Sequence, residues 1–321
     1  MACKPKEIHP NQLAMLCQRT IDRRYFFAPT APNRELFGYM LGKSLHDHDM
    51  DICVGFLMPN HFHLMVYDRH GNRDAMMQQA LSNAARKRNL ELDKRDKLWS
   101  SSRLNDMAVL DAAKALEQVL YVALQAVAAG LIERGGEREG FMVLPRHWGK
   151  PMRFHRHKYC ADDMPETVEF TPMPPPGFEH LELQEAIDFF ENLIAEKELE
   201  YKKRRKGAPV LGIDVVASRN PFWTPSTPSP MGQLNPTFTS SDPVRIRKAI
   251  ERIKEFNKWH RQALTEFRKG KRNVEFPAGT VQMSRLAGCR SATAAADHPF
   301  HYDKTWSNEL QSSWDTWLKT R

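Results

Sequence analysis

Hydrophobic and polar residues change their spacing several times in the first 160 residues, and the changes predict short strands. The aromatic run at 24–28 is a first strand candidate, closed by prolines. The apolar run at 51–57 and the alternating run at 61–67 are separated by a Pro59-Asn60 turn signal, which predicts a β-hairpin. Residues 140–144 offer one more strand.

Helical spacing lies between these strand candidates. Asn33 can cap a helix that continues to Ser44, residues 74–92 are helical by composition, and Asn105 can cap a longer helix that stops at Gly130 or Gly135. The resulting order is strand, helix, strand, strand, helix, strand. It predicts an α+β fold with a ferredoxin-like split βαβ core, in which an antiparallel sheet has helices on one face.

The composition and hydrophobic pattern of the chain change after residue 160. A proline-rich connector at 171–177 precedes a predicted helix at 181–205, and residues 218–243 are rich in Pro, Ser and Thr, as is typical of an irregular or extended segment. Residues 245–272 predict a strongly basic helix. We therefore expect three parts: a catalytic domain at 1–160, a Pro-rich linker with one helix at 161–244, and a mainly helical and irregular basic DNA-binding extension at 245–321.

Composition and charge narrow the class of protein. A hydrophobic fraction of 41% and a charged fraction of 27% fit a globular chain of 321 residues, and exclude collagen-like and wholly disordered proteins. The 47 Lys and Arg residues against 39 Asp and Glu residues give a net charge of +8, which favours an anionic partner such as nucleic acid. In residues 245–272, 11 basic residues face three Glu, so this helix alone could account for the whole excess.

Cysteine usage and hydropathy suggest where the protein works. Five widely spaced cysteines without a signal peptide make a disulfide scaffold improbable and fit a reducing cytoplasm. The longest apolar stretch, 119–132, falls short of the ~18 residues that a membrane span needs, so no membrane partner is expected.

His61 and His63 are the first candidates for chemistry. In a strand, alternate side chains share one face, so both imidazoles would converge on one point as metal ligands. Considered without their context, the two histidines are better explained by a solvated sheet face than by a metal site.

Tyr121 and Gln125 lie four residues apart in an otherwise apolar helix, so they share one helix face, which Glu117 continues. A buried glutamine needs a polar partner, because an unpaired amide costs about 1–3 kcal/mol. A metal or a phosphate would satisfy it. On spacing alone, Tyr121 is better explained as a core tyrosine with a locally bonded hydroxyl, and Glu117 as a solvated or ion-paired residue rather than a ligand.

Two stretches of the chain resemble a known family. Met58-Pro-Asn-His-Phe-His-Leu-Met, followed by Tyr121-Val-Ala-Leu-Gln-Ala-Val-Ala-Ala-Gly-Leu-Ile, is similar to the signature of the single-tyrosine HUH transposases, and in particular of their REP-associated branch. Lys97-Leu98-Trp99 resembles the Leu-Trp that precedes the tyrosine helix in that branch. The resemblance covers roughly residues 20–135, and the C-terminal segment 245–280 resembles the extension of a longer subgroup.

The resemblance implies a function and a set of roles. It implies a ferredoxin-like enzyme that nicks and rejoins single-stranded, hairpin-associated DNA through a covalent 5′-phosphotyrosine, with Tyr121 as nucleophile. The divalent ion, Mg²⁺ or Mn²⁺, would be held by His61, His63 and Gln125. Gln125 stands where the branch usually has Asn, and Ala126 stands where proline is common, which predicts a more continuous helix than usual. The family also implies a bacterial, nucleoid-associated location, no organic cofactor, and in some members a homodimer.

Basic residues provide candidate DNA contacts, because single strands and hairpins are held by positive grooves and aromatic stacking. For the helix after residue 244, a solvated basic face or a helix packed through its isoleucines remains an alternative. The candidates are Arg23, Arg24, Arg86, Lys87, Arg88 and Arg103 near the core, and Arg245, Arg247, Lys248, Arg252, Lys254, Lys258 and Arg261 in the helix.

Two rival interpretations remain open. His147, His155, His157 and Cys160 could form a zinc site, although a basic surface loop or a DNA-contacting segment explains them better. The chain could also be a domesticated, non-catalytic DNA- or RNA-binding protein with a vestigial site.

Overall fold

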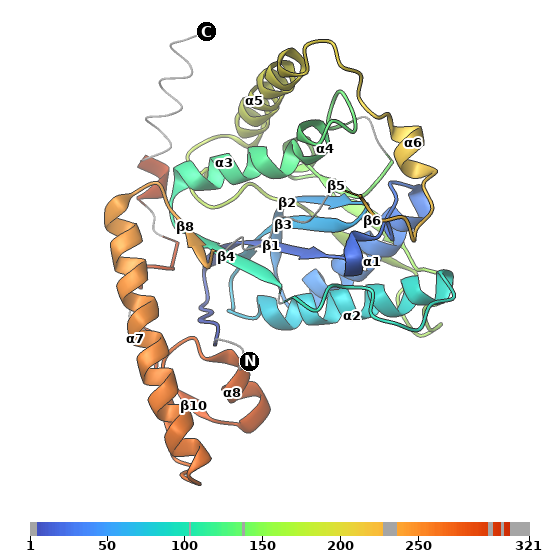
Figure 1. Cartoon of the computed structure of the whole chain (residues 1–321). Helices are drawn as coiled ribbons and strands as arrows, with labels where there is room; N and C mark the ends of the chain where they lie inside the picture. The colour runs from blue at the N-terminus through green and yellow to red at the C-terminus, as the bar shows by residue number, and fades with distance from the viewer. Residues whose placement is uncertain are drawn as a thin grey trace.

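A six-stranded mixed sheet forms the centre of the molecule in the computed structural model, which describes residues 5–102, 104–136, 139–226, 236–294, 298–302 and 305–308 (Figure 1). Its strand order is β5-β2-β3-β1-β4-β8, and every neighbouring pair is antiparallel except β4 and β8, which are parallel. The strands are β1 (Gln12–Arg19), β2 (Asp51–Met58), β3 (His61–Asp68), β4 (Asn105–Val109), β5 (Met142–Val143) and β8 (Phe238–Thr239).

The central strands are buried on both faces, and this explains why the sequence prediction found the hairpin but misplaced the first strand. The β2–β3 hairpin with its turn at 59–60 is confirmed. The predicted strand at 24–28 is wrong, because these residues form a turn within irregular backbone, and their aromatic side chains pack inward. The first strand is instead β1, which is buried along nearly its whole length and so lacks the alternation that marks a half-exposed strand.

Helices α1 (Ala31–Asp47) and α2 (Arg73–Glu91) cover one face of the sheet, as expected from the predicted helices at 33–44 and 74–92. Their apolar side chains pack with Leu16, Phe62 and Leu64 of the central strands. A small hairpin of β6 (Met152–His155) and β7 (Thr167–Phe170) packs on α1 at Gly38, where a Cβ atom would overlap the ring of Phe154.

The opposite face is covered too, which corrects the prediction that helices lie on one face only. Helices α3 (Ala112–Ala123), α4 (Gln125–Ala128) and α5 (Leu183–Arg204) lie above the sheet in Figure 1. Their apolar residues form a second core with alternate residues of the same strands, including Met15 and Met65. Helix α5 was predicted, but its apolar stripe gave no sign of which surface it would bury.

The long helix predicted from Asn105 is also wrong at its start. Residues 105–109 form β4, and the helix begins after Asp111, whose carboxylate accepts a hydrogen bond from the backbone N–H of Lys114 at 2.8 Å. Asp111 is thus the true N-cap. The helix is interrupted at Leu124, in contrast to the expected continuity, although the backbone N–H of Ala128 still donates to the Leu124 carbonyl at 2.8 Å.

The C-terminal part returns to the edge of the sheet through β8 and continues as the basic helix α7, which Figure 1 shows along the side of the core. The three tryptophans Trp306, Trp314 and Trp317 also predict a short docked helix near the C-terminus; Trp306 is buried, and Trp314 and Trp317 lie outside the described residues. No helix in the described ranges is long and apolar enough to cross a bilayer. The remaining elements are the short 3-10 helices Ile21–Arg23 and Pro145–His147, α6 (Ile213–Ala217), α7 (Pro243–Arg268), β9 (Glu275–Phe276), α8 (Val281–Ala287) and β10 (Arg290–Ser291).

Candidate functional site

The two histidines of the β2–β3 hairpin lie together at one end of the sheet. His61 and His63 alternate along β3 and therefore share a face, and their ring centroids are 5.0 Å apart. Across the strand pair, His61 faces Arg19 and His63 faces Cys17. His63 is buried, whereas His61 is only partly covered.

Helix α3 brings Tyr121 to the same end of the sheet. The Tyr121 ring lies edge-on to the His63 ring, with a centroid distance of 5.3 Å, and the tyrosine side chain is 50% exposed. Gln125 is linked to His61 by a side-chain hydrogen bond, and its Nε2 donates to the Tyr121 carbonyl at 3.0 Å. The structure therefore brings together all four residues that the sequence singled out. Glu117 is exposed and paired with Lys114 at 2.5 Å, outside this group.

Both imidazoles are neutral at physiological pH. Burial, together with the nearby positive charge of Arg19, lowers the pKa of His61 to about 4 and that of His63 to about 3. The Nδ1 of His61 lies 2.7 Å from the amide oxygen of Asn60, and a second hydrogen bond joins the His61 ring to the side chain of Gln125. Neutral imidazoles and an amide oxygen are donors that suit a divalent cation.

Arg19 is a candidate residue that the sequence analysis missed. It is the exposed last residue of β1, directly opposite His61 in the strand register. A guanidinium here can bind a phosphate, because its planar donors match two phosphate oxygens. Only knowledge of β1 and its register could have pointed to it.

Four of the predicted DNA-contact residues near the core already contact backbone carbonyls or polar side chains of the protein. Arg23 donates to the Pro225 carbonyl and Lys87 to the Tyr159 carbonyl, at 3.1 and 2.7 Å. Arg24 contacts Asp22 and Arg86 contacts Asn83, at 3.5 and 2.5 Å.

Arg88 is buried, and its guanidinium binds the Phe26 carbonyl and the Glu91 carboxylate at 2.7 and 2.5 Å. It is held inside the protein and presents no phosphate-binding surface, so this part of the prediction is wrong. Arg103 lies outside the described residues.

The sequence analysis also missed an exposed aromatic pair, which lies beside Arg24 and Arg219. Phe222 and Trp223 are 44% and 36% exposed, and the backbone of Trp223 accepts a hydrogen bond from Tyr25 N–H at 3.2 Å. The Arg219 guanidinium lies 4.2 Å from the centre of the Trp223 ring, and the Arg24 guanidinium 5.9 Å from that of Phe222. Aromatic and cationic planes of this kind are typical surfaces for unpaired bases.

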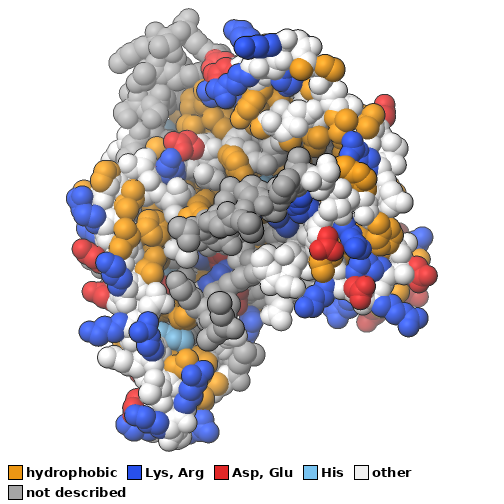
Figure 2. All heavy atoms as spheres, viewed as in Figure 1, with side chains coloured by type: hydrophobic (Ala, Val, Ile, Leu, Met, Phe, Trp, Pro, Cys, Tyr) orange, Lys and Arg blue, Asp and Glu red, His pale blue; other side chains and the backbone are white. Residues whose placement is uncertain are grey.

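The basic side chains of helix α7 point in two directions, toward the core and toward solvent. Arg245 and Arg252 turn inward, to the Leu110 carbonyl and the Glu7 carboxylate, at 3.1 and 2.8 Å. Lys and Arg side chains also line the outward side of the helix, mixed with hydrophobic ones (Figure 2). Among the predicted DNA contacts, the exposed residues are Arg247, Lys248, Lys254, Lys258 and Arg261.

The alternative zinc site does not assemble. His147 Nδ1 accepts the Leu144 backbone N–H, His157 pairs with Glu91, and His155 lies beside Glu35, at 3.0, 2.8 and 3.5 Å. Within the described part of the chain, the only group of three or more His, Cys, Asp or Glu side chains that could hold a metal consists of Glu7, His9 and His298. The sequence analysis missed it because its members are separated by almost the whole chain.

No protein-family model matches the chain, and no curated protein matches it by sequence. A solved structure of a REP-associated tyrosine transposase bound to a REP hairpin is similar at 12% identity with a TM-score of 0.39, covering 46% of this chain and 85% of that one. A proposed transposase from Deinococcus radiodurans R1 is similar at 16% identity with a TM-score of 0.26, covering 33% and 85%.

Proposed function

We propose that the protein is a metal-dependent transposase and endonuclease of the single-tyrosine HUH type, close to its REP-associated branch. It would nick and rejoin single-stranded, hairpin-associated DNA through a 5′-phosphotyrosine. The observation that carries this proposal is the grouping of His61, His63, Gln125 and Tyr121 at one open end of the sheet.

The proposal includes a ferredoxin-like split βαβ core. It is supported by the element order β1-α1-β2-β3-α2-β4, by the strand order β2-β3-β1-β4 within the larger sheet, and by the position of α1 and α2 on one face. In this arrangement α3 to α5 are additions that cover the second face, and α3 carries the tyrosine.

The donor set fits a divalent cation, Mg²⁺ or Mn²⁺, held by His61, His63 and Gln125. Both imidazoles are neutral, and the Gln125 amide lies against His61. A bound cation would polarise the scissile phosphate and offset the charge that builds on its oxygens.

The residues of the chain supply the nucleophile and a second positive charge. The Tyr121 oxygen attacks the phosphorus, a Tyr121 O–P bond forms, and the P–O3′ bond breaks. The phenolic proton is lost and the departing 3′-oxygen gains one, so a free 3′-hydroxyl leaves. Arg19, opposite His61, would bind a phosphate oxygen and so orient the strand. Because a phosphoester replaces a phosphoester, the reverse reaction rejoins DNA without an added energy source.

The surfaces around the site suit a single strand that leads away from a hairpin. Phe222 and Trp223 offer stacking planes flanked by Arg24 and Arg219. Each stacked base contributes about 1–3 kcal/mol. The outward basic side of α7 would bind backbone phosphates in a salt-dependent manner.

The proposal is tested by incubating the full chain with labelled hairpin oligonucleotides and Mn²⁺ or Mg²⁺, followed by a denaturing gel. We expect a labelled band shifted by the mass of the protein, absent in Tyr121→Phe and present in Tyr159→Phe. Tyr159 is a matched control because it is also exposed but lies beside α2, on the other side of the sheet.

Two outcomes would contradict the proposal. Cleavage without an adduct would indicate hydrolysis by an activated water. Hairpin binding with neither adduct nor cleavage, and unchanged by Tyr121→Phe, would favour a DNA-binding protein whose site is vestigial.

A further inference from the structure

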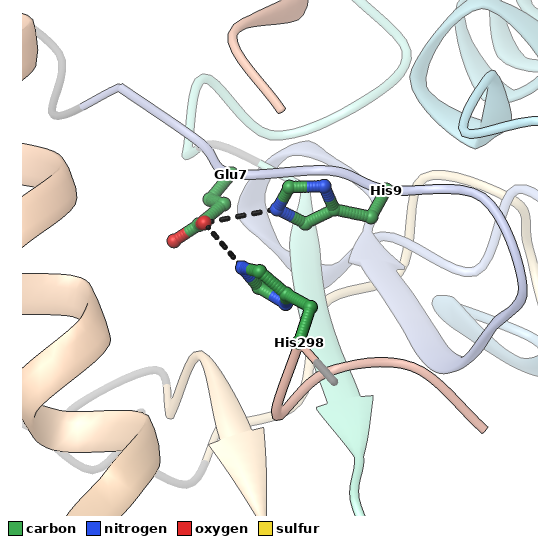
Figure 3. Close-up of side chains that lie close together, drawn as sticks. All are labelled: Glu7, His9 and His298. Atoms are coloured by element: carbon green, nitrogen blue, oxygen red, sulfur yellow. Dashed lines mark hydrogen bonds and ion pairs between the residues drawn. The ribbon is translucent and has the colours of Figure 1, made fainter. Parts of the chain in front are cut away.

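A second cluster of metal-binding side chains lies far from Tyr121. Glu7 and His9 precede β1, and His298 comes from the C-terminal region (Figure 3). The Nε2 atoms of His9 and His298 lie 2.9 and 3.0 Å from the same Glu7 carboxylate oxygen, and the ligand atoms of all three residues lie within 4.8 Å of one another. Two imidazoles and a carboxylate therefore converge on one small volume.

The cluster is enclosed by the protein. His9 and His298 are 1% and 6% exposed, and their rings are 3.9 Å apart by centroid. The loop before α8 closes over them, since the Ile8 backbone N–H donates to the Gly279 carbonyl at 3.0 Å. Gly279 has a φ of +81°, and a Cβ atom there would collide with the His9 ring. This close approach explains the glycine.

We propose that Glu7, His9 and His298 bind a structural zinc ion, with His301 as the candidate fourth ligand. The His301 ring lies 5.5 Å from that of His9 and 5.2 Å from that of His298 by centroid. A carboxylate with three imidazoles is a nitrogen-rich, four-ligand set that suits Zn²⁺ better than Mg²⁺ or Ca²⁺. Nothing in the proposed cleavage reaction uses this ion, so the inference goes beyond the proposed function.

Arg252 places a positive charge beside the proposed zinc site, and this charge would repel the ion unless the Glu7 carboxylate separates the two. Its Nε lies 2.8 Å from Oε1 of Glu7 and 2.9 Å from Nε2 of His298, while Oε2 of Glu7 is buried without a hydrogen-bond partner. The carboxylate therefore has two oxygens for two positive groups. With one oxygen on zinc and the other on Arg252, the guanidinium becomes the hydrogen-bond donor that orients a ligating carboxylate.

The two histidine clusters are separate. Along the β1–β3 pair, Gln12 faces Asp68 at one end and Arg19 faces His61 at the other. An eight-residue strand spans roughly 25 Å, so one ion cannot serve both ends. Zinc at Glu7, His9 and His298 would instead join the segment before β1, the segment around 298–301 and, through Arg252, helix α7.

The test counts zinc in the full-length His61→Ala/His63→Ala protein, because the hairpin histidines could themselves hold zinc. After incubation with Zn²⁺ and dialysis, we expect about one zinc per chain by elemental analysis. Adding His9→Ala or His298→Ala should remove it, whereas His260→Ala should not. His260 is a matched control, because it is buried in α7 against Phe256 and Phe276, apart from the cluster.

Thermal melting gives a readout that needs no substitution in the Glu7, His9 and His298 cluster. EDTA should lower the melting temperature of the His61→Ala/His63→Ala protein, and added Zn²⁺ should restore it. Folded protein that retains no zinc and shows no such shift would overturn the proposal, as would one equivalent of zinc that persists with His9 and His298 both replaced. Formation of the phosphotyrosine adduct is measured in the wild type and does not depend on zinc at this cluster. Zinc can therefore bind when no adduct forms, and the adduct can form when no zinc binds, so the two proposals are tested independently.

Discussion

The two ends of the β1–β3 strand pair carry two groups of histidines that differ in their access to solvent. At the hairpin end, His63 is buried, but His61 is only partly covered and the neighbouring Tyr121 is 50% exposed. At the other end, His9 and His298 are both almost completely buried. The comparison teaches that the two groups differ in accessibility: the hairpin group includes side chains that face solvent, whereas His9 and His298 are enclosed by other parts of the chain.

The largest effect is expected at the open end. His63→Ala should reduce adduct formation on the order of 10²–10³-fold, the size seen when one group that stabilises transition-state charge is lost. Single-turnover cleavage of a hairpin oligonucleotide measures it. Cys17→Ala is the control, because Cys17 faces His63 in the strand register while burial raises the pKa of its thiol to about 11, which excludes a reactive thiolate. Equal losses in both variants would mean that the effect is structural.

Near the closed end, stability should respond more than activity. Asp106 is buried and binds Arg73 Nε and Lys6 Nζ at 3.0 and 3.1 Å. Asp106→Ala should lower the free energy of unfolding by about 3–5 kcal/mol, because it leaves the buried Arg73 charge with less compensation. Urea denaturation measures this change.

Asp51→Ala removes a more exposed partner of Arg69 and should cost less than about 1 kcal/mol. A similar decrease in the free energy of unfolding for Asp106→Ala and Asp51→Ala would contradict the claim that burial makes the Asp106 ion pairs more important for stability.

The same carboxylate predicts an acid sensitivity. Burial alone would raise the pKa of Asp106, but the charges of Arg73 and Lys6 hold it below its ordinary value. The stabilisation is therefore complete above the unfolded-state pKa near ~4 and is lost as pH falls through the lower folded-state value. Urea midpoints between pH 5 and pH 2 should fall more steeply in the wild type than in Asp106→Asn. Parallel slopes would remove Asp106 from this explanation.

The smallest effect is expected on the outward side of α7. Replacing Lys254, Lys258 and Arg261 by Gln should weaken hairpin binding and flatten its salt dependence by about one unit of log–log slope per lost phosphate contact. Fluorescence anisotropy at several salt concentrations measures both. Arg153→Gln, on the exposed β6–β7 hairpin, is the control. An unchanged slope in the triple variant would leave α7 as a packing helix.

The sequence was informative wherever a pattern was local. The β2–β3 hairpin, α1, α2, α5 and α7 were visible as periodicities, and His61, His63, Tyr121 and Gln125 were found from spacing and resemblance. The first strand was misplaced because β1 is buried on both faces, while the aromatic run at 24–28 imitates a strand.

What could not be predicted depends on contacts between distant parts of the chain. Arg19 becomes a site residue only through its register with β3. Glu7 and His298 meet although 291 positions separate them, and no local pattern records that.

The return of the chain to the edge of the sheet has a practical consequence. Strand β8 pairs with β4, and the backbone N–H groups of Ala108 and Leu110 donate to the carbonyls of Thr237 and Thr239 at 2.9 and 3.0 Å. A fragment that ends at residue 160 would uncover this row of donors together with the apolar side chains beneath it. Bare edges of this kind invite self-association, so the first 160 residues expressed alone should be prone to aggregate, however complete their chemistry.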